Sequence, residues 1–298
     1  MYTIGIDIGG TNTRIALIDE KYKIVKRIQF STDANSPQNT LFEIKKYIDD
    51  LDKNIKGVGL SCPGPLDLKK GIVLTPPNLH GDWHYFNVTE ELSKLLKLPV
   101  YLENDANLAC LAEAIIGKGK DFNYVQFLTV STGLGSGLVI DNKIYQGSHG
   151  FAHEIANIPL WKDGPSHGSI YPGGIEAISS GTAITLRAQK AGLDVKHAGE
   201  VANLAKSGNQ VACRIMNEAV EYLANTIAII YAFIDPDIVI LGGSVAIKID
   251  GFVQEIENRV KEKVYYNIKN LVKVVKTNLD EDSGLLGAAC LVNLNYKF

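Results

Sequence analysis

Residues 2–19 of the chain read YTIGIDIGGTNTRIALID, and this stretch constrains both the fold and the function. Two runs rich in apolar and β-branched residues flank a Gly-Gly-Thr centre, which predicts a β-hairpin with a glycine turn. Glycines let a backbone approach a bulky anion closely and direct N–H groups at it, so we expect the turn to bind a nucleotide phosphate. The alternative is a surface hairpin that needs glycine only for its turn. The candidate nucleotide-binding residues here are Asp7, Gly9, Gly10, Thr11 and Asn12.

Composition restricts the class of protein. The chain has 298 residues, of which 46% are hydrophobic and 21% charged, and its formal net charge is −3. These values are typical of a soluble globular protein with one large domain or two, and they offer no electrostatic case for nucleic acid. The most apolar stretch, 223–234, is interrupted by Asn225 and Thr226 and is too short to span a bilayer, and no secretory signal is recognisable. The four cysteines have no paired spacing, so we expect reduced thiols in a cytoplasmic protein.

Strand and helix signals alternate after the first hairpin. Strands are predicted at 23–30, at 57–61 and at 100–103, and helices at 39–50 and 106–116. This alternation indicates a mixed α/β sheet. Two irregular loops, 63–65 and 76–83, are rich in proline, and loops of this kind often line binding sites although most are only connections. Asn78 in the second loop is a minor candidate for substrate binding.

The hairpin pattern returns at residues 124–141, YVQFLTVSTGLGSGLVID. Aligning Asp141 with Asp19 places the two glycine clusters near each other, so the chain is predicted to be internally duplicated. Two hairpins from two related halves could close on a phosphate chain from either side. Thr132 and Gly133 are therefore further candidates for nucleotide binding.

The second half of the chain continues with a helix opening near residue 176, a long helix at 211–233 and a strand at 238–241. Gly242 and Gly243 follow that strand, and a glycine turn at the carboxyl end of a strand is where open α/β sheets place ligands. The last helix is predicted to begin at Ser283.

Asp105 is the candidate general base. It follows the predicted strand 100–103 at the point where a helix begins, which directs its side chain toward a cleft. The alternative is that Asn104 or Asp105 merely caps the helix. Capping does not exclude catalysis, because a helix N-terminus keeps a carboxylate ionised and ready to accept a proton.

Glu154 and Glu176 lie in a stretch, 147–181, that is dense in Gly, Pro and Ser. Two carboxylates there could accept hydrogen bonds from sugar hydroxyls, or they could be solvated surface charges. The same stretch contains His149, His153 and His167, but no second cluster of Cys or carboxylate offers the short ligand spacing of a structural zinc site.

Several motifs taken together resemble the ROK family of sugar kinases, within the actin-like and hexokinase-like ATPase superfamily. The resemblance covers essentially the whole chain. It is carried, in order along the sequence, by Asp7-Ile8-Gly9-Gly10-Thr11, Pro63-Gly64-Pro65, Glu103-Asn104-Asp105-Ala106-Asn107, Thr132-Gly133-Leu134-Gly135, Glu154 and Leu241-Gly242-Gly243.

The resemblance implies an α/β, two-domain actin-like (ribonuclease H-like) ATPase fold with a cleft between duplicated lobes. We expect the lobes at 1–117 and 118–298, with the final helix a candidate to pack back on the first. By the same resemblance the two hairpins grip the phosphates of ATP, Gly242 and Gly243 border the adenosine, and Asn104 with Asp105 holds the sugar. Glu154 and Glu176 resemble sugar-hydroxyl ligands, magnesium is expected with the ATP, and the expected assembly is a homodimer.

Departures from the family pattern concern zinc. Where the family has Gly-Glu-x-Gly-His, this chain has His153-Glu154-Ile155-Ala156-Asn157, so Asn157 stands where a histidine binds zinc and contacts sugar. The three family cysteines fall on His167, Ser169 and Gly174. Losing all four ligands removes the coordination chemistry, so we expect no zinc and a loop that is held by packing.

The leading hypothesis is therefore an ATP-dependent, magnesium-requiring hexose kinase that phosphorylates a primary hydroxyl, at position 6 of glucose or of an N-acetylated amino sugar. Zinc-free relatives that act on N-acetylmannosamine or β-glucosides put simple glucokinase activity in doubt. One rival is a sugar sensor without useful catalysis, motivated by the missing histidine and zinc cluster. Another is an actin-like or chaperone-like ATPase that acts on protein partners.

Overall fold

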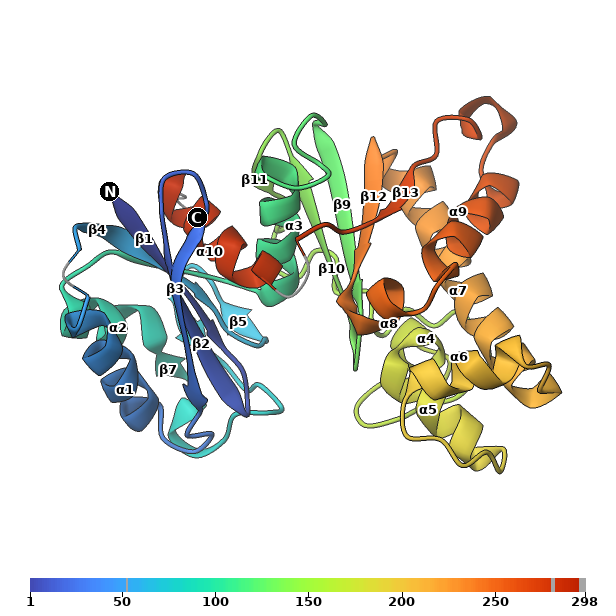
Figure 1. The fold of residues 1–298 in the computed structure, drawn as a ribbon, viewed down its shortest axis with the longest axis horizontal. Coiled ribbons are helices and arrows are strands. Elements are labelled where there is room, and N and C mark those ends of the chain that lie inside the picture. Colours follow the sequence, from blue (N-terminus) through green and yellow to red (C-terminus); the bar gives the residue numbers. More distant parts are fainter. Residues whose placement is uncertain (52, 280–281, 295–298) are drawn as a thin grey trace. The chain divides into compact units, whose positions relative to one another are not determined.

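The computed structural model describes residues 1–51, 53–279 and 282–294. Contacts divide the chain into two compact units, whose elements are labelled in Figure 1. Unit 1 comprises Met1–Ile116, Gln146–Gly150 and the described part of Glu281–Phe298, and unit 2 comprises Gly117–Tyr145 and the described part of Phe151–Asp280. The short segment Gln146–Gly150 belongs to unit 1 although unit 2 precedes and follows it in the sequence.

Unit 1 contains a five-stranded mixed sheet. Its order is β3-β2-β1-β4-β8, with the first three strands antiparallel and with β4 and β8 parallel to β1. The predicted hairpin and strands are confirmed. The strands are β1 (Tyr2–Ile8), β2 (Asn12–Ile18), β3 (Ile24–Ser31), β4 (Ile55–Ser61) and β8 (Val100–Glu103).

Two helices cover one face of this sheet, α1 (Pro37–Asp49) and α2 (Val88–Leu96). Every second residue of β1 from Ile4 to Ile8 points to this face and is at most 1% exposed, packed with apolar residues of both helices. Each such side chain contributes about 1.5–3 kcal/mol through burial. Helix α1 begins two residues before the predicted start, because the Ser36 side chain caps it and Pro37 suits a first helical position.

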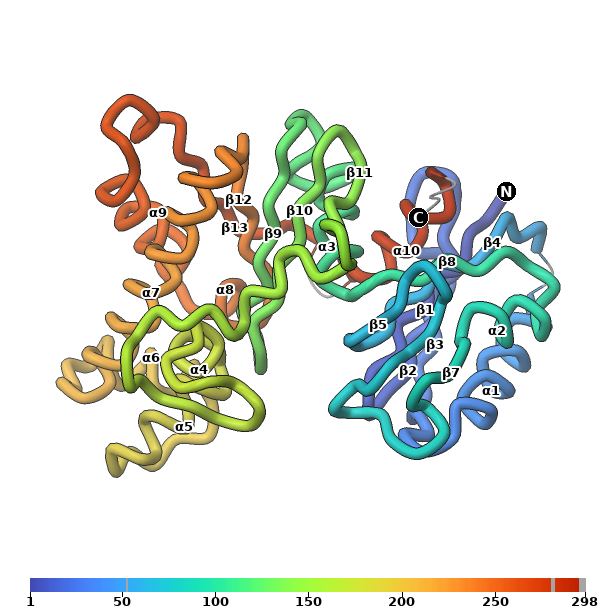
Figure 2. Tube along the Cα trace, turned by 180° about the vertical axis from the view of Figure 1, so that it is seen from behind, coloured from blue at the N-terminus to red at the C-terminus, as the bar shows by residue number. Residues whose placement is uncertain are grey.

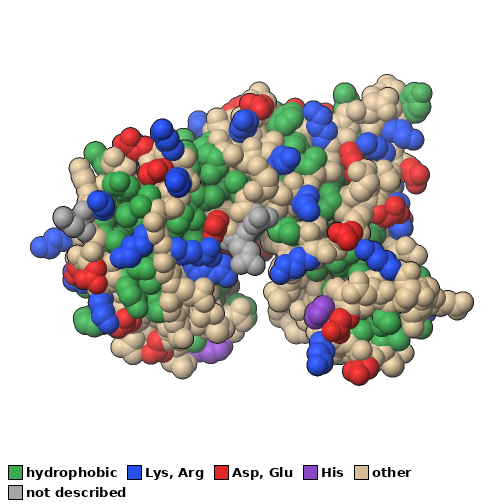
Figure 3. All heavy atoms as spheres, in the orientation of Figure 1, with side chains coloured by type: hydrophobic (Ala, Val, Ile, Leu, Met, Phe, Trp, Pro, Cys, Tyr) green, Lys and Arg blue, Asp and Glu red, His purple; other side chains and the backbone are tan. Residues whose placement is uncertain are grey.

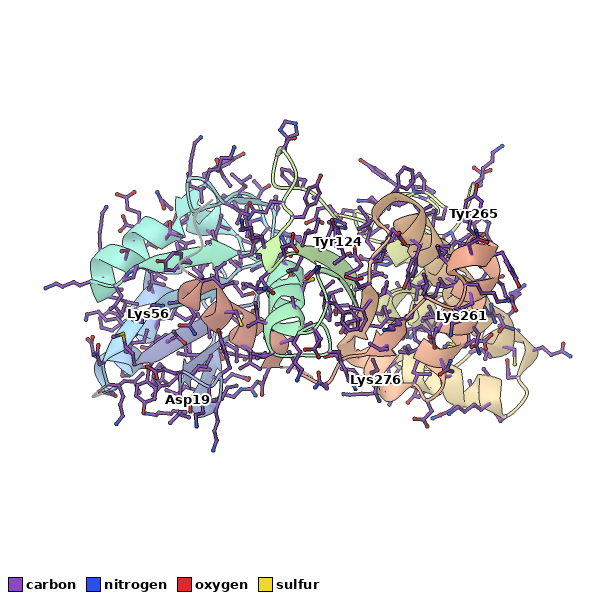
Figure 4. All side chains as sticks on the ribbon, turned by 90° about the horizontal axis from the view of Figure 1, so that it is seen from above. Asp19, Lys56, Tyr124, Lys261, Tyr265 and Lys276 are labelled. Atoms are coloured by element: carbon purple, nitrogen blue, oxygen red, sulfur yellow. The ribbon has the colours of Figure 1, made fainter. Side chains whose placement is uncertain are left out.

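The other face of the sheet lies against α10 (Ser283–Asn293), which also packs on α3 (Asp105–Ile115). The close approach depends on glycine. A Cβ atom at Gly59 would lie 2.0 Å from the Ala288 carbonyl oxygen, and one at Gly5 would lie 2.5 Å from that of Leu285. Near the end of α10, the Lys56 ammonium donates to the Asn293 carbonyl at 3.3 Å, a favourable position for a cation (Figure 4).

A small sheet follows β4, made of β5 (Leu66–Asp67), β6 (Ile72–Val73) and β7 (Phe86–Asn87). The sequence predicted only irregular loops here, because two-residue strands are too short to show an alternating pattern. The 3₁₀ turn η1 (Gly81–Trp83) buries Trp83, whose indole N–H donates to the Asp33 carbonyl at 2.8 Å.

Unit 2 repeats the sheet of unit 1. Its order is β11-β10-β9-β12-β13, again with three antiparallel strands followed by two parallel ones. The topology therefore supports the predicted duplication. The strand bounds confirm the alignment of Asp141 with Asp19, because the same shift places β1 on β9 and β2 on β10 from end to end. Only the pairing register differs by one residue: the last pair before the turn is Ile8 with Thr13 in unit 1 and Val130 with Leu134 in unit 2. The strands are β9 (Tyr124–Val130), β10 (Leu134–Ile140), β11 (Lys143–Ile144), β12 (Ile238–Gly242) and β13 (Val274–Lys276).

Helices of unit 2 pack on one face of this sheet, and α4, α5 and α6 lie together in Figure 2. They are α4 (Ile175–Ser179), α5 (Gly181–Lys190), α6 (Ala198–Lys206), α7 (Gln210–Ile234), α8 (Gly243–Lys248) and α9 (Phe252–Lys263), followed by the 3₁₀ turn η2 (Tyr266–Ile268). The long helix predicted at 211–233 is confirmed as α7. Within the described residues, neither α7 nor any other helix has the length and apolar character needed to cross a membrane. Acidic and basic side chains are interspersed over the face shown in Figure 3.

Candidate active site

A row of polar side chains crosses the sheet of unit 1 near the carboxyl ends of its parallel strands. Asp7 on β1 is paired with Arg14 on β2 and with Ser61 on β4, and Ser61 is paired with Glu103 on β8. Paired residues of neighbouring strands direct their side chains to the same face. The row therefore gathers two carboxylates, a hydroxyl and a guanidinium at the edge where α/β sheets bind ligands.

Opposing effects act on the pKa of the Asp7 carboxyl group. Burial raises the pKa of its carboxyl group, and the Ser61 hydroxyl, Arg14 and Arg27 lower it. Ser61 lies close enough to influence Asp7, but its buried Oγ atom forms no hydrogen bond of normal geometry with any described residue. This buried hydroxyl therefore has an unused hydrogen-bonding capacity beside Asp7.

Asn104 and Asp105 divide two roles at the start of α3. The Asn104 side chain caps the helix by accepting hydrogen bonds from the backbone of Ala106 at 2.9 Å and of Asn107 at 3.4 Å. One oxygen of Asp105 accepts from the Ala106 N–H at 2.8 Å. The capping alternative thus applies mainly to Asn104, and Asp105 keeps its second oxygen for another partner.

The environment of Asp105 suits a proton acceptor. Its side chain is exposed to solvent, yet protein atoms surround the carboxyl group densely. This desolvation first, and then the Asp7 carboxylate, raise the pKa of Asp105, while backbone N–H groups oppose the shift. A carboxylate with a raised pKa takes a proton more readily near neutral pH. Burial and the same two carboxylates also raise the pKa of the neighbouring Cys62 thiol, so it stays protonated.

Glu103 is a buried carboxylate. It belongs to the motif at 103–107, but no role was assigned to it from the sequence. It is fully buried at the end of β8 and accepts three hydrogen bonds, from Asn104, Asn107 and Gln146. Burial raises its pKa, and these donors lower it. The sequence feature that could have indicated a role for Glu103 is its position: it is a carboxylate at the end of a strand, two residues before the candidate base Asp105.

The first glycine turn packs against the loop that contains Asn78. The turn is closed by a hydrogen bond from the Gly9 N–H to the Asn12 carbonyl at 2.9 Å, and Thr11 and Asn12 are exposed. A Cβ atom at Gly10 would lie 2.6 Å from the Asn78 carbonyl oxygen. The structure therefore brings Asn78 and the candidate phosphate turn together.

The second glycine turn borders a cavity of about 810 Å³ in unit 2. Its walls come from α5, α6 and α8 and from the turn itself, including Thr132 and Ser244. Lysine side chains of α6 and α8 reach its lining, which suits an anionic ligand. Gly242 and Gly243 lie beside the turn: Gly242 is paired with Thr129, and Gly243 has φ +84° with the Val130 carbonyl only 2.5 Å from where its Cβ would be. The volume is that of a small-molecule site.

Glu176 lies at the second glycine turn. Its Oε2 atom accepts a hydrogen bond from the Leu134 N–H at 2.8 Å, and this oxygen would be 2.9 Å from a Cβ at Gly133. Glu176, which we expected to bind the sugar, therefore lies next to Gly133, which we expected to bind the phosphates. One Glu176 oxygen is used for this structural contact.

The loop after Gly150 places the other predicted sugar ligands. Glu154 is exposed, and the Asn157 side chain accepts from the Tyr171 N–H at 2.8 Å. His153 packs edge-on against Tyr145, and burial lowers its pKa. Within the described ranges, no group of three or more His, Cys, Asp and Glu side chains is arranged to hold a metal ion.

Aromatic stacking holds the part of this loop that carries His167, Ser169 and Gly174. Trp161 stacks on Tyr222 of α7 with ring centroids 5.3 Å apart and planes 6° apart, and the Arg187 guanidinium lies 5.7 Å from the Trp161 ring. The Leu160 N–H donates to the Gly173 carbonyl at 2.9 Å. This cluster anchors the loop to α5 and α7.

Known proteins resemble the chain over nearly its whole length. A glucokinase of Thermotoga maritima is 30% identical, over 97% of this chain and 96% of its own length. An N-acetylmannosamine kinase of Salmonella heidelberg is 32% identical, over 98% of each chain.

Solved structures agree with these relatives. A ROK hexokinase from Thermus thermophilus has a TM-score of 0.88 and 27% identity, with 99% of each chain covered. A ROK family glucokinase from Streptomyces griseus, in complex with glucose and AMPPNP, has a TM-score of 0.76 and 26% identity, with 99% of this chain and 100% of that chain covered. The model of the ROK family matches residues 3–294. A match of this extent means that the chain belongs to the ROK family.

Proposed function

We propose that the chain is an ATP-dependent sugar kinase in which Asp105 is the general base. The observation that carries this proposal is the Asp105 carboxylate at the start of α3, with a raised pKa and with Asp7 beside it. The glucokinase and N-acetylmannosamine kinase relatives support the class of reaction, a phosphotransfer to a sugar.

The proton and the phosphoryl group move as follows. Asp105 accepts the proton of the sugar hydroxyl while the hydroxyl oxygen forms a bond to the γ-phosphorus and the bond to the ADP oxygen breaks. Little other covalent chemistry is required of the protein, because phosphoryl transfer depends mainly on positioning and electrostatic stabilisation.

The proposed nucleotide-binding residues of unit 2 are Thr132, which lines its cavity, with Gly133, Gly242 and Gly243 near it. Those of unit 1 are Asp7 and the first glycine turn, where Gly9, Gly10, Thr11 and Asn12 offer backbone N–H groups and a hydroxyl. Magnesium, bound with the nucleotide, neutralises phosphate charge. The residues fit it, because Asp7 offers a carboxylate and the neighbouring Ser61 hydroxyl has an unused hydrogen-bonding capacity.

The sugar is assigned to Asn78, Asn104, Asp105, Glu154, Asn157 and Glu176. The Asn104 oxygen caps α3, so its amide group is the donor toward a hydroxyl. The Asn157 oxygen likewise holds Tyr171, and Glu176 offers the oxygen that does not hold Leu134. Donors and acceptors fixed in this way discriminate strongly between hydroxyl configurations.

The proposed substrates are hexoses and N-acetylated amino sugars, phosphorylated at the primary hydroxyl on position 6. The identities of 30% and 32% to relatives with different sugars do not favour one over the other. A homodimer is the assembly that the family resemblance implies, and light scattering after size exclusion tests it. A cytoplasmic location would keep the thiols of Cys62, Cys110, Cys213 and Cys290, none of which forms a disulfide bond in the described residues, reduced.

A coupled ADP-release assay tests the proposal. The panel contains glucose, mannose, fructose, allose, N-acetylglucosamine, N-acetylmannosamine and a β-glucoside, each with ATP and magnesium. We expect sugar-dependent ADP release with at least one hexose or N-acetylated amino sugar. Sugar binding in a calorimeter without ADP release across the whole panel would contradict a kinase and favour a sensor.

A further inference from the structure

The Glu103 carboxylate joins two parts of unit 1 that are distant in sequence. Its Oε1 atom accepts from the Asn104 N–H at 2.8 Å and from the Asn107 side-chain amide at 3.0 Å. Its Oε2 atom accepts from the Gln146 side-chain amide at 2.6 Å. Both oxygens are therefore used, one by the start of α3 and the other by the segment Gln146–Gly150.

The three partners match an ionised carboxylate. All three are donors, and no basic side chain of the described residues forms an ion pair with Glu103. Burying a carboxylate without a counter-ion is costly, and its hydrogen bonds only offset that cost. An apolar residue at the end of β8 would avoid the cost, so stability alone is a poor explanation for a carboxylate at this position.

The hydrogen bonds of Glu103 lie next to residues that are proposed to bind the sugar or accept its proton. On one side it fixes the backbone of Asn104 and the first turn of α3, from which Asp105 presents its carboxylate. On the other side it fixes Gln146, the first residue of the segment that leads to the loop with Glu154 and Asn157. A single buried group thus holds both the proposed base and the beginning of the proposed sugar loop.

We infer that Glu103 is a positioning residue that acts through Asn104 and Gln146 to hold the proposed base and the segment Gln146–Gly150, which leads to the sugar loop, in one arrangement. The inference rests on the proposed function and assigns it a further residue pair. Displacement of a reacting group by about 1 Å can cost on the order of 100-fold in rate. Loss of the Glu103–Gln146 hydrogen bond is therefore expected to lower kcat/KM for sugar and to leave the KM for ATP within about twofold.

Exchange of the two polar groups tests the inference. In Gln146→Glu two carboxylates face each other, whereas in Glu103→Gln the Gln146 amide can turn by 180° and accept a hydrogen bond from the new amide. We expect Gln146→Glu to lower kcat/KM for the sugar about 10- to 100-fold and Glu103→Gln to lower it only a few-fold. In the double variant the amide at 103 donates to the carboxylate at 146, and kcat/KM returns to within about threefold of the wild-type value. Single effects that simply multiply in the double variant, without recovery, overturn the inference.

Further variants separate positioning from folding. Gln146→Ala removes only the donor and leaves the carboxylate in place, so it remains informative if Glu103→Gln does not fold. An unchanged kcat/KM for sugar in Gln146→Ala also overturns the inference. Val58→Ala, in the buried part of β4, is the control for lost stability, with a lower Tm but an unchanged kcat/KM for sugar. If the wild type phosphorylates a sugar and Asp105→Asn does not, while Gln146→Glu and Gln146→Ala stay fully active, only the inference fails. If the wild type phosphorylates no sugar, the proposed function fails with it.

Discussion

The two sheets have the same strand order but different residues where their strands end. When they are matched at the last pair before each glycine turn, Asp7 corresponds to Thr129, Arg14 to Gly135 and Ser61 to Gly242. Unit 1 thus has a carboxylate, a guanidinium and a buried hydroxyl where unit 2 has one hydroxyl and two glycines. The duplication therefore provides the same arrangement of strand ends in both units. Charge on one copy suits proton transfer and phosphate neutralisation, and small residues on the other let a ligand approach the backbone.

Replacing the proposed base, which only unit 1 provides, is expected to have the largest effect on activity. Asp105→Asn keeps the size of the side chain and the start of α3 but removes the proton acceptor, so we expect kcat to fall about 10²- to 10⁴-fold. Nucleotide affinity should stay nearly unchanged, because the cavity lined by α5, α6 and α8 belongs to unit 2. Steady-state kinetics and nucleotide titration measure both quantities. Near-normal turnover would show that the chemistry of unit 1 does not depend on this carboxylate.

Adding a side chain to unit 2 tests the requirement for small residues. Gly243→Ala forces a residue with φ +84° against the Val130 carbonyl, so the start of α8 must shift beside the cavity. We expect the KM for ATP to rise about 5- to 150-fold, since strain of this kind costs roughly 1–3 kcal/mol. Gly192→Ala is the matched control: its φ is +86°, but a Cβ there meets nothing within 4 Å. Equal effects of the two changes would mean that backbone strain alone, and not close approach, explains Gly243.

Removing the stacked tryptophan tests how unit 2 holds its loop. An aromatic pair contributes about 0.5–1.5 kcal/mol beyond area burial, so Trp161→Ala should raise the KM for sugar about 3- to 10-fold without changing the KM for ATP. Trp161→Phe should restore most of the affinity, and Tyr171→Ala, whose side chain is exposed, should have a smaller effect. A zinc chelator is expected to leave sugar binding unchanged in calorimetry. A loss of sugar affinity with the chelator would show that a metal holds the loop instead.

The smallest expected effect comes from the buried hydroxyl of unit 1. The Ser61 hydroxyl lowers the pKa of Asp7, so Ser61→Ala should raise that pKa. If activity requires ionised Asp7, the acid limb of kcat/KM against pH must then move to higher pH, and kcat at neutral pH should fall only a few-fold. Ser61→Thr keeps the hydroxyl and should keep the wild-type profile. An acid limb that stays in place or moves to lower pH would contradict a role for Ser61 at Asp7. Because Asp7 and Asp105 titrate together, the limb reports the pair.

Local patterns in the sequence were sufficient for the main elements. The alternating strands around the glycine turns, the long apolar face of α7 and the capped start of α3 are each set by residues within a few positions of one another. The same is true of the candidate base, because a carboxylate at a strand end before a helix is visible without a structure. The two-residue strands β5–β7 were missed, since they are too short to carry a period.

By itself the sequence determined the α/β class, the repeated glycine hairpins and the residue types available for chemistry, because short-range periodicity and motif spacing encode them. Only the tertiary structure decided that Glu103 bonds Gln146, that Glu176 holds the second glycine turn, and that Trp161 anchors the loop on Tyr222. Each of these contacts joins residues more than 40 positions apart. Their pairing depends on strand register, on helix packing and on which polar groups are left without partners after folding, and no local pattern records those outcomes.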